Sequence, residues 1–272
     1  MTPPSKQAPV ELVTRARQGA GLETARRSAT AGCTVSVAAR HRDRGTVAAE
    51  EIGARSVPLE VTSDVSVAAA AAQVEADVGH LGILVDDAGI TGPQDDVHDP
   101  TGAGMEQVLA TNVLGYVSVI HAFLPLVEQA DKPRIVNVTS GLGSLARSHD
   151  RSRIESRAGD PFHAAPKTAI NMLTVRDARA LPGLRIGAAD PGPTATTLSG
   201  GMGHSVTDGT DGTDGTDGTD GTDGTDGIMP FAIGEDQDLT GRRRDRGGDV
   251  PWRARPSLPS PTQHTPTVQG AA

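Results

Sequence analysis

Cysteine and aromatic residues are scarce in this sequence. A single cysteine, Cys33, excludes an internal disulfide, and its place before an apolar run predicts a buried structural thiol. Aromatic residues account for 2% of the chain, so Ala, Val, Leu and Ile must form the core. Because aromatic side chains normally bring large buried areas, we expect only modest stability.

A targeting segment and long apolar runs are also missing. The N-terminal stretch 1–10 contains no apolar segment and has Lys6 as its only charged side chain, which is unlike a secretory signal. No uninterrupted apolar run comes near the roughly 18 residues that cross a bilayer. We therefore expect a cytoplasmic protein that does not contact a membrane.

Neither charge sign dominates once one repeat is set aside. The net charge is −9, and residues 207–227 are seven copies of Thr-Asp-Gly whose seven Asp residues account for all but −2 of it. This balance gives no reason to expect a nucleic-acid partner. The repeat has no apolar side chain to offset the entropy of ordering it, so we predict a disordered linker. Its Asp spacing matches neither an EF-hand loop nor the glycine-rich nonapeptide of calcium-binding β-helices, and we expect no metal site.

Short apolar runs alternate with Ala-rich stretches along most of the chain. Each run is continuously apolar, which is typical of a parallel sheet covered on both faces. The predicted strands span residues 10–14, 34–39, 56–61, 83–85, 134–139 and 185–189. The pattern predicts an α/β protein with a doubly wound parallel sheet, a Rossmann fold in three αβα layers.

The same pattern predicts one domain with an insert and a tail. Residues 8–200 form the Rossmann domain, and residues 201–227 form the disordered linker that holds the repeat. Residues 228–252 return to the same domain, with a short element at 228–233. The Pro/Ser/Thr-rich residues 253–272 are expected to be a disordered tail.

A glycine-containing loop follows the first predicted strand and opens the first helix. In this context glycines let a pyrophosphate approach the positive end of the helix, although a tight turn without function would use the same glycines. The loop residues predicted to contact a dinucleotide are Thr14, Arg15, Arg17, Gly19 and Gly21.

Two arginines follow the second predicted strand, where dinucleotide-binding proteins distinguish the two cofactors. Arg40 and Arg42 suit the 2′-phosphate of NADP, whereas an acidic residue would suit the free hydroxyl of NAD. We therefore expect NADP as the cofactor, with NAD less favoured. The alternative is that these arginines form the solvated start of a helix.

An ordered series of motifs resembles the short-chain dehydrogenase/reductase family. The glycine loop is similar to its Thr-Gly-x-x-x-Gly-x-Gly, and residues 86–89, Asp-Asp-Ala-Gly, are similar to its Asn-Asn-Ala-Gly. Residues 111–113, 136–140 and 191–196 continue the series. The resemblance implies further cofactor contacts from Glu60, Val61, Asp87, Ala88, Gly89, Lys167, Pro191, Gly192, Thr194 and Thr196.

The family's catalytic tyrosine position is occupied by a histidine. The resemblance assigns the catalytic positions to Asn112, Ser140, His163 and Lys167. The one tyrosine of the chain, Tyr116, is not placed to substitute. Pro166 disfavours a helical residue before it, so we expect the helix to start near Pro166, with His163 on the preceding loop.

Other departures from the family pattern weaken the expected nucleotide site. Arg15 stands where the family has glycine, and a positive φ there would cost ~1 kcal/mol or more. Asp86 and Asp87 replace uncharged amides, and their charges would repel phosphate unless Arg15 or Arg17 compensates.

The resemblance implies an oxidoreductase that transfers hydride between NADP and a small carbonyl or alcohol substrate. Its activity is expected to be weak, because imidazole reaches roughly 2 Å less far than phenol and Lys167 disfavours the imidazolium form of His163. The alternative is an inactive Rossmann pseudoenzyme that acts as a nucleotide-binding or interaction module. A third alternative places the same fold in another nucleotide class, such as methyl transfer from S-adenosylmethionine. The pair Ser140 and Lys167 argues against it, because methyl transfer does not need these residues. Many family members pair through helices, so the resemblance is compatible with a homo-oligomer.

Overall fold

The computed structural model describes residues 8–92, 100–192, 225–234, 240–245 and 247–252. Thr194, Thr196, most of the Thr-Asp-Gly repeat and the tail 253–272 lie outside the described residues.

One sheet of eight strands, in the order β3-β2-β1-β4-β5-β6-β7-β8, forms the centre of the protein. Its strands are β1 Val10–Val13, β2 Thr34–Ala39, β3 Arg55–Pro58, β4 Ile83–Asp86, β5 Arg134–Val138, β6 Arg185–Ala189, β7 Arg243–Asp245 and β8 Gly248–Val250. All neighbours pair in parallel except β7 and β8, which are antiparallel. The predicted doubly wound sheet is confirmed, and two short strands extend the six that the sequence predicted.

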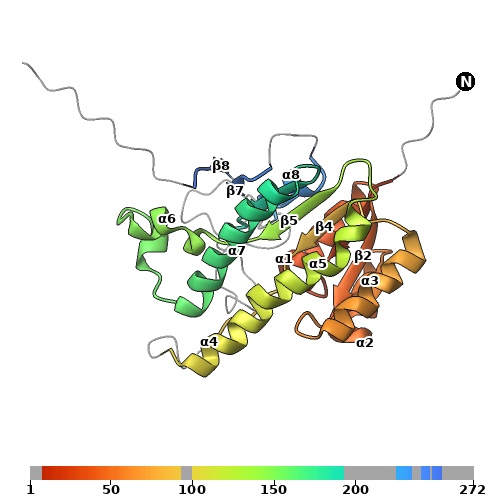
Figure 1. Cartoon of the computed structure of the whole chain (residues 1–272), viewed down its shortest axis with the longest axis horizontal. Coiled ribbons are helices and arrows are strands. Elements are labelled where there is room, and N and C mark those ends of the chain that lie inside the picture. Colours follow the sequence, from red (N-terminus) through yellow and green to blue (C-terminus); the bar gives the residue numbers. More distant parts are fainter. Residues whose placement is uncertain (1–7, 93–99, 193–224, 235–239, 246, 253–272) are drawn as a thin grey trace, which may run out of the picture.

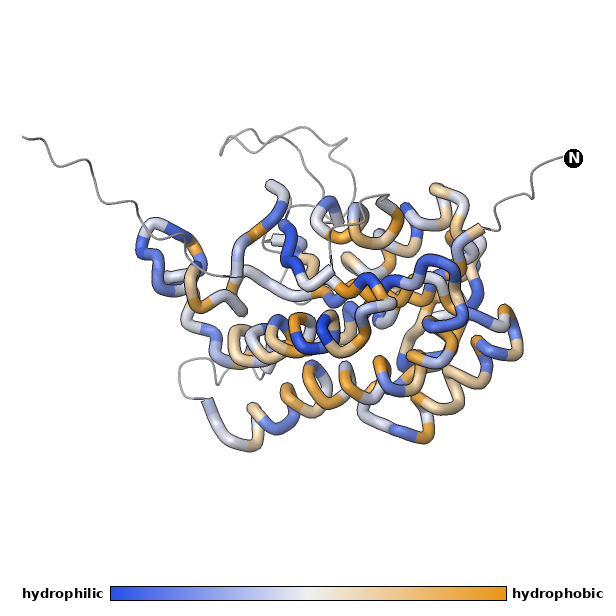
Figure 2. Tube along the Cα trace, turned by 45° about the horizontal axis from the view of Figure 1, so that its top comes forward, coloured by the Kyte–Doolittle hydropathy of each residue, from blue (hydrophilic) through white to orange (hydrophobic). Residues whose placement is uncertain are grey.

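Helices cover both faces of this sheet (Figure 1). The helical elements are α1 Gly19–Thr30, α2 Arg42–Glu51, α3 Asp64–Val78, α4 Gly102–Leu109, the π-helix η2 Ala110–Leu114, α5 Gly115–Val127, the 3-10 helix η3 Gly141–Gly143, α6 Leu145–His149, the 3-10 helix η4 Ile154–Arg157, α7 Pro161–Ala180 and α8 Met229–Ala232. One core cluster joins α3, α5 and α7 to the sheet, and a second joins α1, α2 and α8 to it. The three predicted αβα layers are confirmed, and in Figure 2 the strands and the helices that pack on them are rich in hydrophobic residues.

The continuous helical stretch Gly102–Val127 is long and apolar enough to cross a membrane by length and composition alone. In this fold it is part of the core, because Val108, Val119, Phe123 and Val127 are fully buried. It spans α4, η2 and α5, and it packs against α3 and α7.

Helix α7 begins at Pro161 and not near Pro166, so the expectation that His163 lies on a loop is wrong. The Asp160 carboxylate caps the helix by accepting hydrogen bonds from the backbone N–H groups of Phe162 and His163. Proline at the first helical position fits because that N–H has no intrahelical partner. Pro166 sits inside the helix. The six residues from the Asp160 cap to Ala165 precede it and already set the direction of the helix.

The last copy of the repeat is packed against α1, which differs from the expected disordered linker through residue 227. Thr225 is fully buried, and Arg27 on α1 donates to its hydroxyl at 2.7 Å. Arg27 also pairs with Asp226 at 3.0 Å. The chain then enters α8, whose Phe231 lies so close to Gly187 on β6 that a Cβ there would clash.

Cys33 is half-buried, so the expectation of a buried thiol is only partly right. Burial, and then the carboxylate of Glu11, raise the pKa of Cys33 to about 11. The thiol therefore stays protonated near neutral pH and is a poor nucleophile.

Glu11 in the middle of β1 is a carboxylate inside the core. It is fully buried, and among the described residues neither of its oxygens has a hydrogen-bond partner, nor do the hydroxyls of Thr24 and Ser28 on α1. Burial raises the pKa of Glu11 from 4.5 to about 7, and Ser28 offsets part of this effect although its geometry falls short of a full hydrogen bond.

Replacing Glu11 with Gln is expected to raise the free energy of unfolding at pH 8 by up to about 3 kcal/mol and to change it little at pH 5. Between pH 4.5 and about 7 the unfolded chain releases this proton while the folded chain keeps it, so wild-type stability falls as the pH rises. Urea unfolding at both pH values measures the difference, with the exposed Glu50→Gln as control. A gain of equal size at pH 5 and pH 8 would contradict the prediction.

Candidate active site at the carboxyl ends of the strands

The Thr14 hydroxyl joins the carboxyl ends of β1 and β4. It donates to Asp86 Oδ1 at 2.7 Å and accepts from the backbone N–H groups of Asp87 and Ala88, both at 2.9 Å. Because parallel strands end at one edge of the sheet, this network places residues 86–89 beside the glycine loop. Thr14 therefore fixes the geometry of the loop.

The glycine loop holds a strained residue and an open helix end. Arg15 has a φ of 56°, which is in the left-handed region. Glycine adopts this conformation more easily than arginine, and the sequence analysis expected a cost for Arg15 at such a φ. Helix α1 starts at Gly19, and within the described part the Gln18 side chain does not cap it, since it contacts Arg17 instead. The first N–H groups of α1 are thus available to an anionic group.

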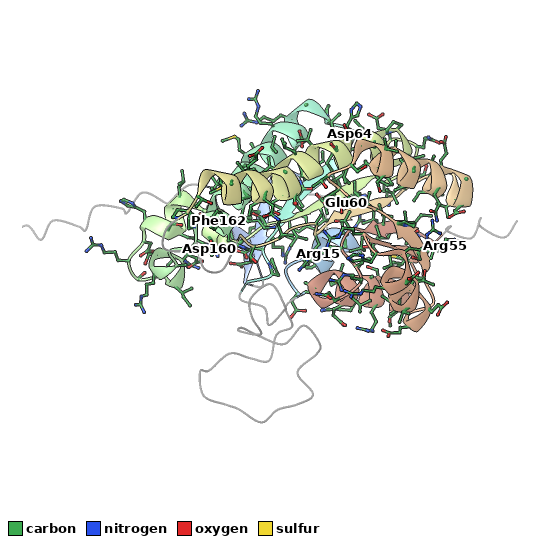
Figure 3. All side chains as sticks on the ribbon, turned by 90° about the horizontal axis from the view of Figure 1, so that it is seen from below. Arg15, Arg55, Glu60, Asp64, Asp160 and Phe162 are labelled. Atoms are coloured by element: carbon green, nitrogen blue, oxygen red, sulfur yellow. The ribbon has the colours of Figure 1, made fainter. Side chains whose placement is uncertain are left out.

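Four arginines gather next to this loop. Burial, followed by the charges of Arg44, Arg15 and Arg40, lowers the pKa of Arg17. Positive charge therefore accumulates here without full neutralisation, although Arg40 pairs with Glu60 at 3.6 Å. Figure 3 shows Arg15 and Glu60 close to this end of the sheet. Arg44 on α2 was missed by the sequence analysis, and it is the next basic residue after Arg42.

Lys167 is a buried ammonium on α7 that points at the end of β5. Its Nζ donates to the Val138 carbonyl at 2.6 Å. Burial lowers the pKa of Lys167, while Asp87 and Asp86 act in the opposite direction. The ammonium and the two carboxylates therefore belong to one buried group of charges.

His163 lies one helical turn before Lys167, so the two side chains share a face of α7. It is half-buried. Burial, and then the charge of Lys167, lower the pKa of His163 to about 4. The imidazole is consequently neutral at pH 7, as the sequence argument about Lys167 predicts.

Phe162 next to it is fully buried and fills the space beside Gly92 and Gly104, where any Cβ would clash with its ring or meet it tightly. This contact anchors the start of α7 against α4. The sequence analysis missed both Phe162 and the cap Asp160, although an Asp-Pro pair is a recognisable helix start. Figure 3 shows both residues at the beginning of α7.

Asn112 lies in the π-helical turn η2 and is locked to the loop after β4. Its Oδ1 accepts from the backbone N–H of Ile90 at 2.8 Å, and its Nδ2 donates to the Ile90 carbonyl at 2.9 Å. Both ends of the side-chain amide are thereby engaged. Single π-helical turns occur frequently at functional sites.

Ser140 follows β5, and its hydroxyl accepts from the backbone N–H of Leu142 at 3.3 Å. The short helix η3 packs directly on α7, because a Cβ on Gly143 would lie 2.6 Å from the carbonyl carbon of Lys167. Asn171 Nδ2 also donates to the Gly143 carbonyl at 3.0 Å. The segment with Ser140 is therefore held against the helix with His163 and Lys167.

The other predicted contact residues are distributed along the same edge. Val61 is buried against Gly115, and Gly89 lies beside the Asn112 amide. Gly192 follows β6, and its N–H donates to Asp190 at 3.0 Å. The described residues contain no group of three or more His, Cys, Asp or Glu side chains that could hold a metal ion.

A buried ionic cluster that the sequence analysis missed borders the Ser140 segment. Arg147 on α6 pairs with Glu155 at 3.0 Å and with Asp190 at 3.3 Å, and its other nitrogen contacts Asp245 on β7. We call these four residues the Arg147 cluster. Sequence periodicity could not reveal it, because its members come from four separate segments.

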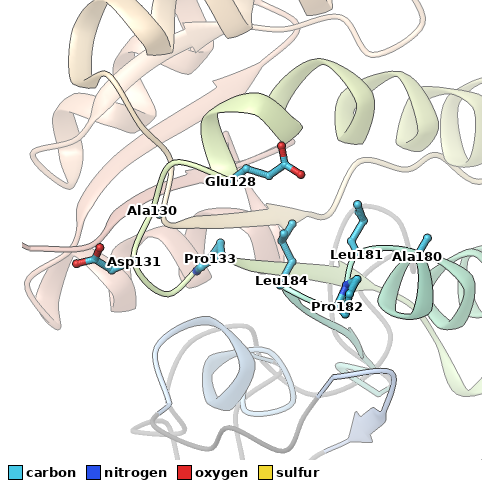
Figure 4. Close-up of a pocket in the computed structure, with 9 residues that line it drawn as sticks. Glu128, Ala130, Asp131, Pro133, Ala180, Leu181, Pro182 and Leu184 are labelled. Carbon is cyan, nitrogen blue, oxygen red and sulfur yellow. The ribbon is translucent and has the colours of Figure 1, made fainter.

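A hollow lies elsewhere in the fold. A pocket of about 440 Å³ is lined by the ends of α5 and α7 and by the residues that precede β5 and β6, among them Glu128, Pro133, Leu181 and Leu184 (Figure 4). These residues lie at the amino ends of the strands, opposite Ser140 and Lys167. We place the candidate site at the carboxyl ends of the strands because of the residues that gather there.

The comparisons with known proteins agree with the Rossmann-like fold described above. Residues 9–206 match the family model described as short chain dehydrogenase. The short-chain dehydrogenase anuI of Penicillium roqueforti is 32% identical over 208 residues, which cover 72% of this chain and 82% of that protein.

Solved structures agree with this result. Gluconate 5-dehydrogenase from Burkholderia cenocepacia, in complex with NADP and tartrate, is 26% identical with a TM-score of 0.60, covering 70% of this chain and 73% of that one. Salutaridine reductase from Papaver somniferum, at 20% identity, shows the same fold with a TM-score of 0.71, covering 87% of this chain and 99% of that one.

The chain belongs to the short-chain dehydrogenase family, whose members are oxidoreductases that use nicotinamide dinucleotides. The resemblance that the motifs predicted is thereby confirmed.

Proposed function

We propose that the protein is an NADP-dependent oxidoreductase that moves hydride between the cofactor and a small carbonyl or alcohol substrate, and that it works slowly. The observation that carries this proposal is the cluster of Arg15, Arg17, Arg40 and Arg44 beside the open N-terminus of α1. A pyrophosphate fits the helix end, and a 2′-phosphate fits the surplus positive charge.

Each part of the dinucleotide would contact a different set of residues along this edge. Gly19 and Gly21 would admit the pyrophosphate, Arg40 the 2′-phosphate, and Glu60, Val61 and residues 87–89 the adenosine half. Lys167, Pro191 and Gly192 would hold the nicotinamide half, with Thr194 and Thr196 following. Bound NADP accepts a hydride from an alcohol, or donates one to a carbonyl in its reduced form.

Each of the four catalytic positions would have its own role in the reaction. Ser140 would orient the substrate oxygen, and Lys167 would hold the ribose while its charge acts on His163. Asn112 would fix the loop after β4 through Ile90. His163 would take or give the proton of the substrate hydroxyl.

The protonation state of His163 limits the proton transfer in both directions. With a pKa of about 4 it is neutral at pH 7, so the acid form needed for carbonyl reduction is scarce and the imidazole is a weak base toward an alcohol. Because both directions share one transition state, turnover should be slow in each of them near neutral pH. The active site differs in this respect from one that uses a phenol.

Two further features of the proposal concern assembly and location. Leu114, Val117 and Met172 are large apolar side chains exposed on η2, α5 and α7, and burying them supports a homo-oligomer. The lone Cys33 is in keeping with the cytoplasmic location that we propose, because thiols stay reduced there.

Titrating the protein with NADPH and NADH while recording nicotinamide fluorescence tests the cofactor assignment. Replacing Arg40 with Asp is expected to weaken NADPH binding at least tenfold and to leave NADH binding within a few-fold, because the 2′-phosphate loses its cation. Arg55→Asp, at an exposed position of β3, makes the same charge change as a control. Equal losses for both cofactors would refute the assignment of Arg40, and binding without any turnover of alcohols or carbonyls would favour the pseudoenzyme.

A further inference from the structure

The end of α1 already faces an anionic side chain of the protein itself. Asp87 is 9% exposed, and within the described part of the chain its Oδ2 has no hydrogen-bond partner. This oxygen lies 3.0 Å from the point where a Cβ of Gly21 would be. Gly21 is in the first turn of α1, so the carboxyl group lies where the helix presents its free N–H groups.

Charged and polar groups surround Asp87 from every element that packs there. Arg15 of the glycine loop is its ion-pair partner, with an Nη1–Oδ2 distance of 3.8 Å, too long for a hydrogen bond. Lys167 on α7 and the backbone of Gly21 also favour the charged form, but burial is the larger effect and raises the pKa of Asp87. Asp86 next to it is buried as well, but Thr14 donates to that carboxylate.

A backbone acceptor also lies near the Asp87 carboxyl group. The Arg15 carbonyl is 3.2 Å from the same point beside Gly21. A carboxylate cannot donate a hydrogen bond to such an oxygen, whereas a protonated carboxyl group or an amide has a proton to donate.

We propose that Asp87 couples dinucleotide binding to the uptake of one proton, because its carboxylate and the cofactor's pyrophosphate compete for the same end of α1. This inference rests on the proposed function, since it concerns the same nucleotide site. The protonated form leaves the helix end to the phosphates and donates to the loop. The charged form repels the phosphates and draws Arg15 away from them.

The coupling predicts a pH dependence with a definite sign. Above the pKa of Asp87 in the free protein, each further pH unit should weaken binding about tenfold, because the protein must first take up a proton. NADH is the suitable probe, since its pyrophosphate does not titrate between pH 6 and 9. NADPH carries a 2′-phosphate that ionises near pH 6, so it serves as the second probe.

Binding of NADH and NADPH by the full chain should be measured at several pH values between 6 and 9 for three proteins. Asp87→Asn is expected to bind NADH at least tenfold more tightly than wild type at pH 8 and to lose the pH dependence. Asp86→Asn, which removes a neighbouring buried carboxylate that does not face Gly21, is expected to keep it. Circular dichroism establishes that each variant is folded.

Each outcome separates this inference from the proposed function. Wild-type NADH binding that does not change with pH, and equals that of Asp87→Asn, overturns the inference alone. Loss of the pH dependence in Asp86→Asn and not in Asp87→Asn overturns it too. Proton-coupled binding without preference for NADPH and without turnover supports the inference and refutes the proposed function. Failure of every protein to bind either probe overturns both.

Discussion

Replacing His163 with Tyr is expected to raise NADPH-dependent reduction of aldehydes and ketones by about 100- to 10,000-fold at pH 7, the usual contribution of a general acid. The wild-type imidazole has a pKa of about 4, so its acid form is rare at this pH. A phenol is protonated at pH 7, and Lys167 favours its ionisation. Initial rates against a panel of carbonyl compounds measure the gain.

The helix geometry makes the single substitution sufficient. His163 and Lys167 already lie one turn apart on α7, so adding Pro166→Ser should change the rate little. His163→Phe is the control, because it has a similar ring and no proton to donate. A His163→Tyr protein that binds NADPH but is no faster than His163→Phe would show that the missing phenol is not the main defect.

Replacing Arg147 with Met is expected to lower the free energy of unfolding by about 1 to 3 kcal/mol, because the buried Asp190 loses a charged hydrogen-bond partner. Arg147 also pairs with Glu155 and Asp245, but Arg153 keeps Glu155 paired at 2.9 Å. For a domain of this size the melting temperature should fall by roughly 3 to 10 °C.

The exposed Arg151, four residues away in sequence, is the matched control. Arg151→Met removes the same charge and should shift the melting temperature by no more than a degree or two, since exposed charges contribute little. Thermal unfolding by calorimetry compares the two variants. Equal melting temperatures for wild type and Arg147→Met would show that the Arg147 cluster does not stabilise the fold.

The periodicity of apolar residues was enough to predict the six parallel strands of the sheet. It did not reveal the two short strands, and it did not locate the start of α7. Continuous apolar runs identify β1 to β6 because parallel strands are buried on both faces. The strands β7 and β8 are three residues each; β7 is entirely charged and β8 has a single apolar side chain, so no apolar pattern reveals them. The start of α7 was misplaced because Pro166 was given more weight than the Asp160 cap, which acts first along the chain.

The candidate site was predictable in its residue types and not in its interactions. The motifs place Ser140, His163 and Lys167 near one edge, and the positive φ of Arg15 follows from the family's glycine at that position. The partners of these groups come from distant segments, as with Asp87 beside Gly21. Contacts of that kind depend on three-dimensional packing, which the pattern of one sequence does not contain.

The packing of α8 has a consequence for the order in which the protein folds during synthesis. Phe231 of α8 covers Gly187 on β6, and Ile228 and Phe231 belong to the core cluster on that face. About 40 residues separate β6 from α8, which takes roughly 2 to 8 s at ordinary elongation rates. During that interval the part of this face that α8 covers stays open, although α1 and α2 are already made, and the exposed apolar surface favours aggregation and capture by chaperones.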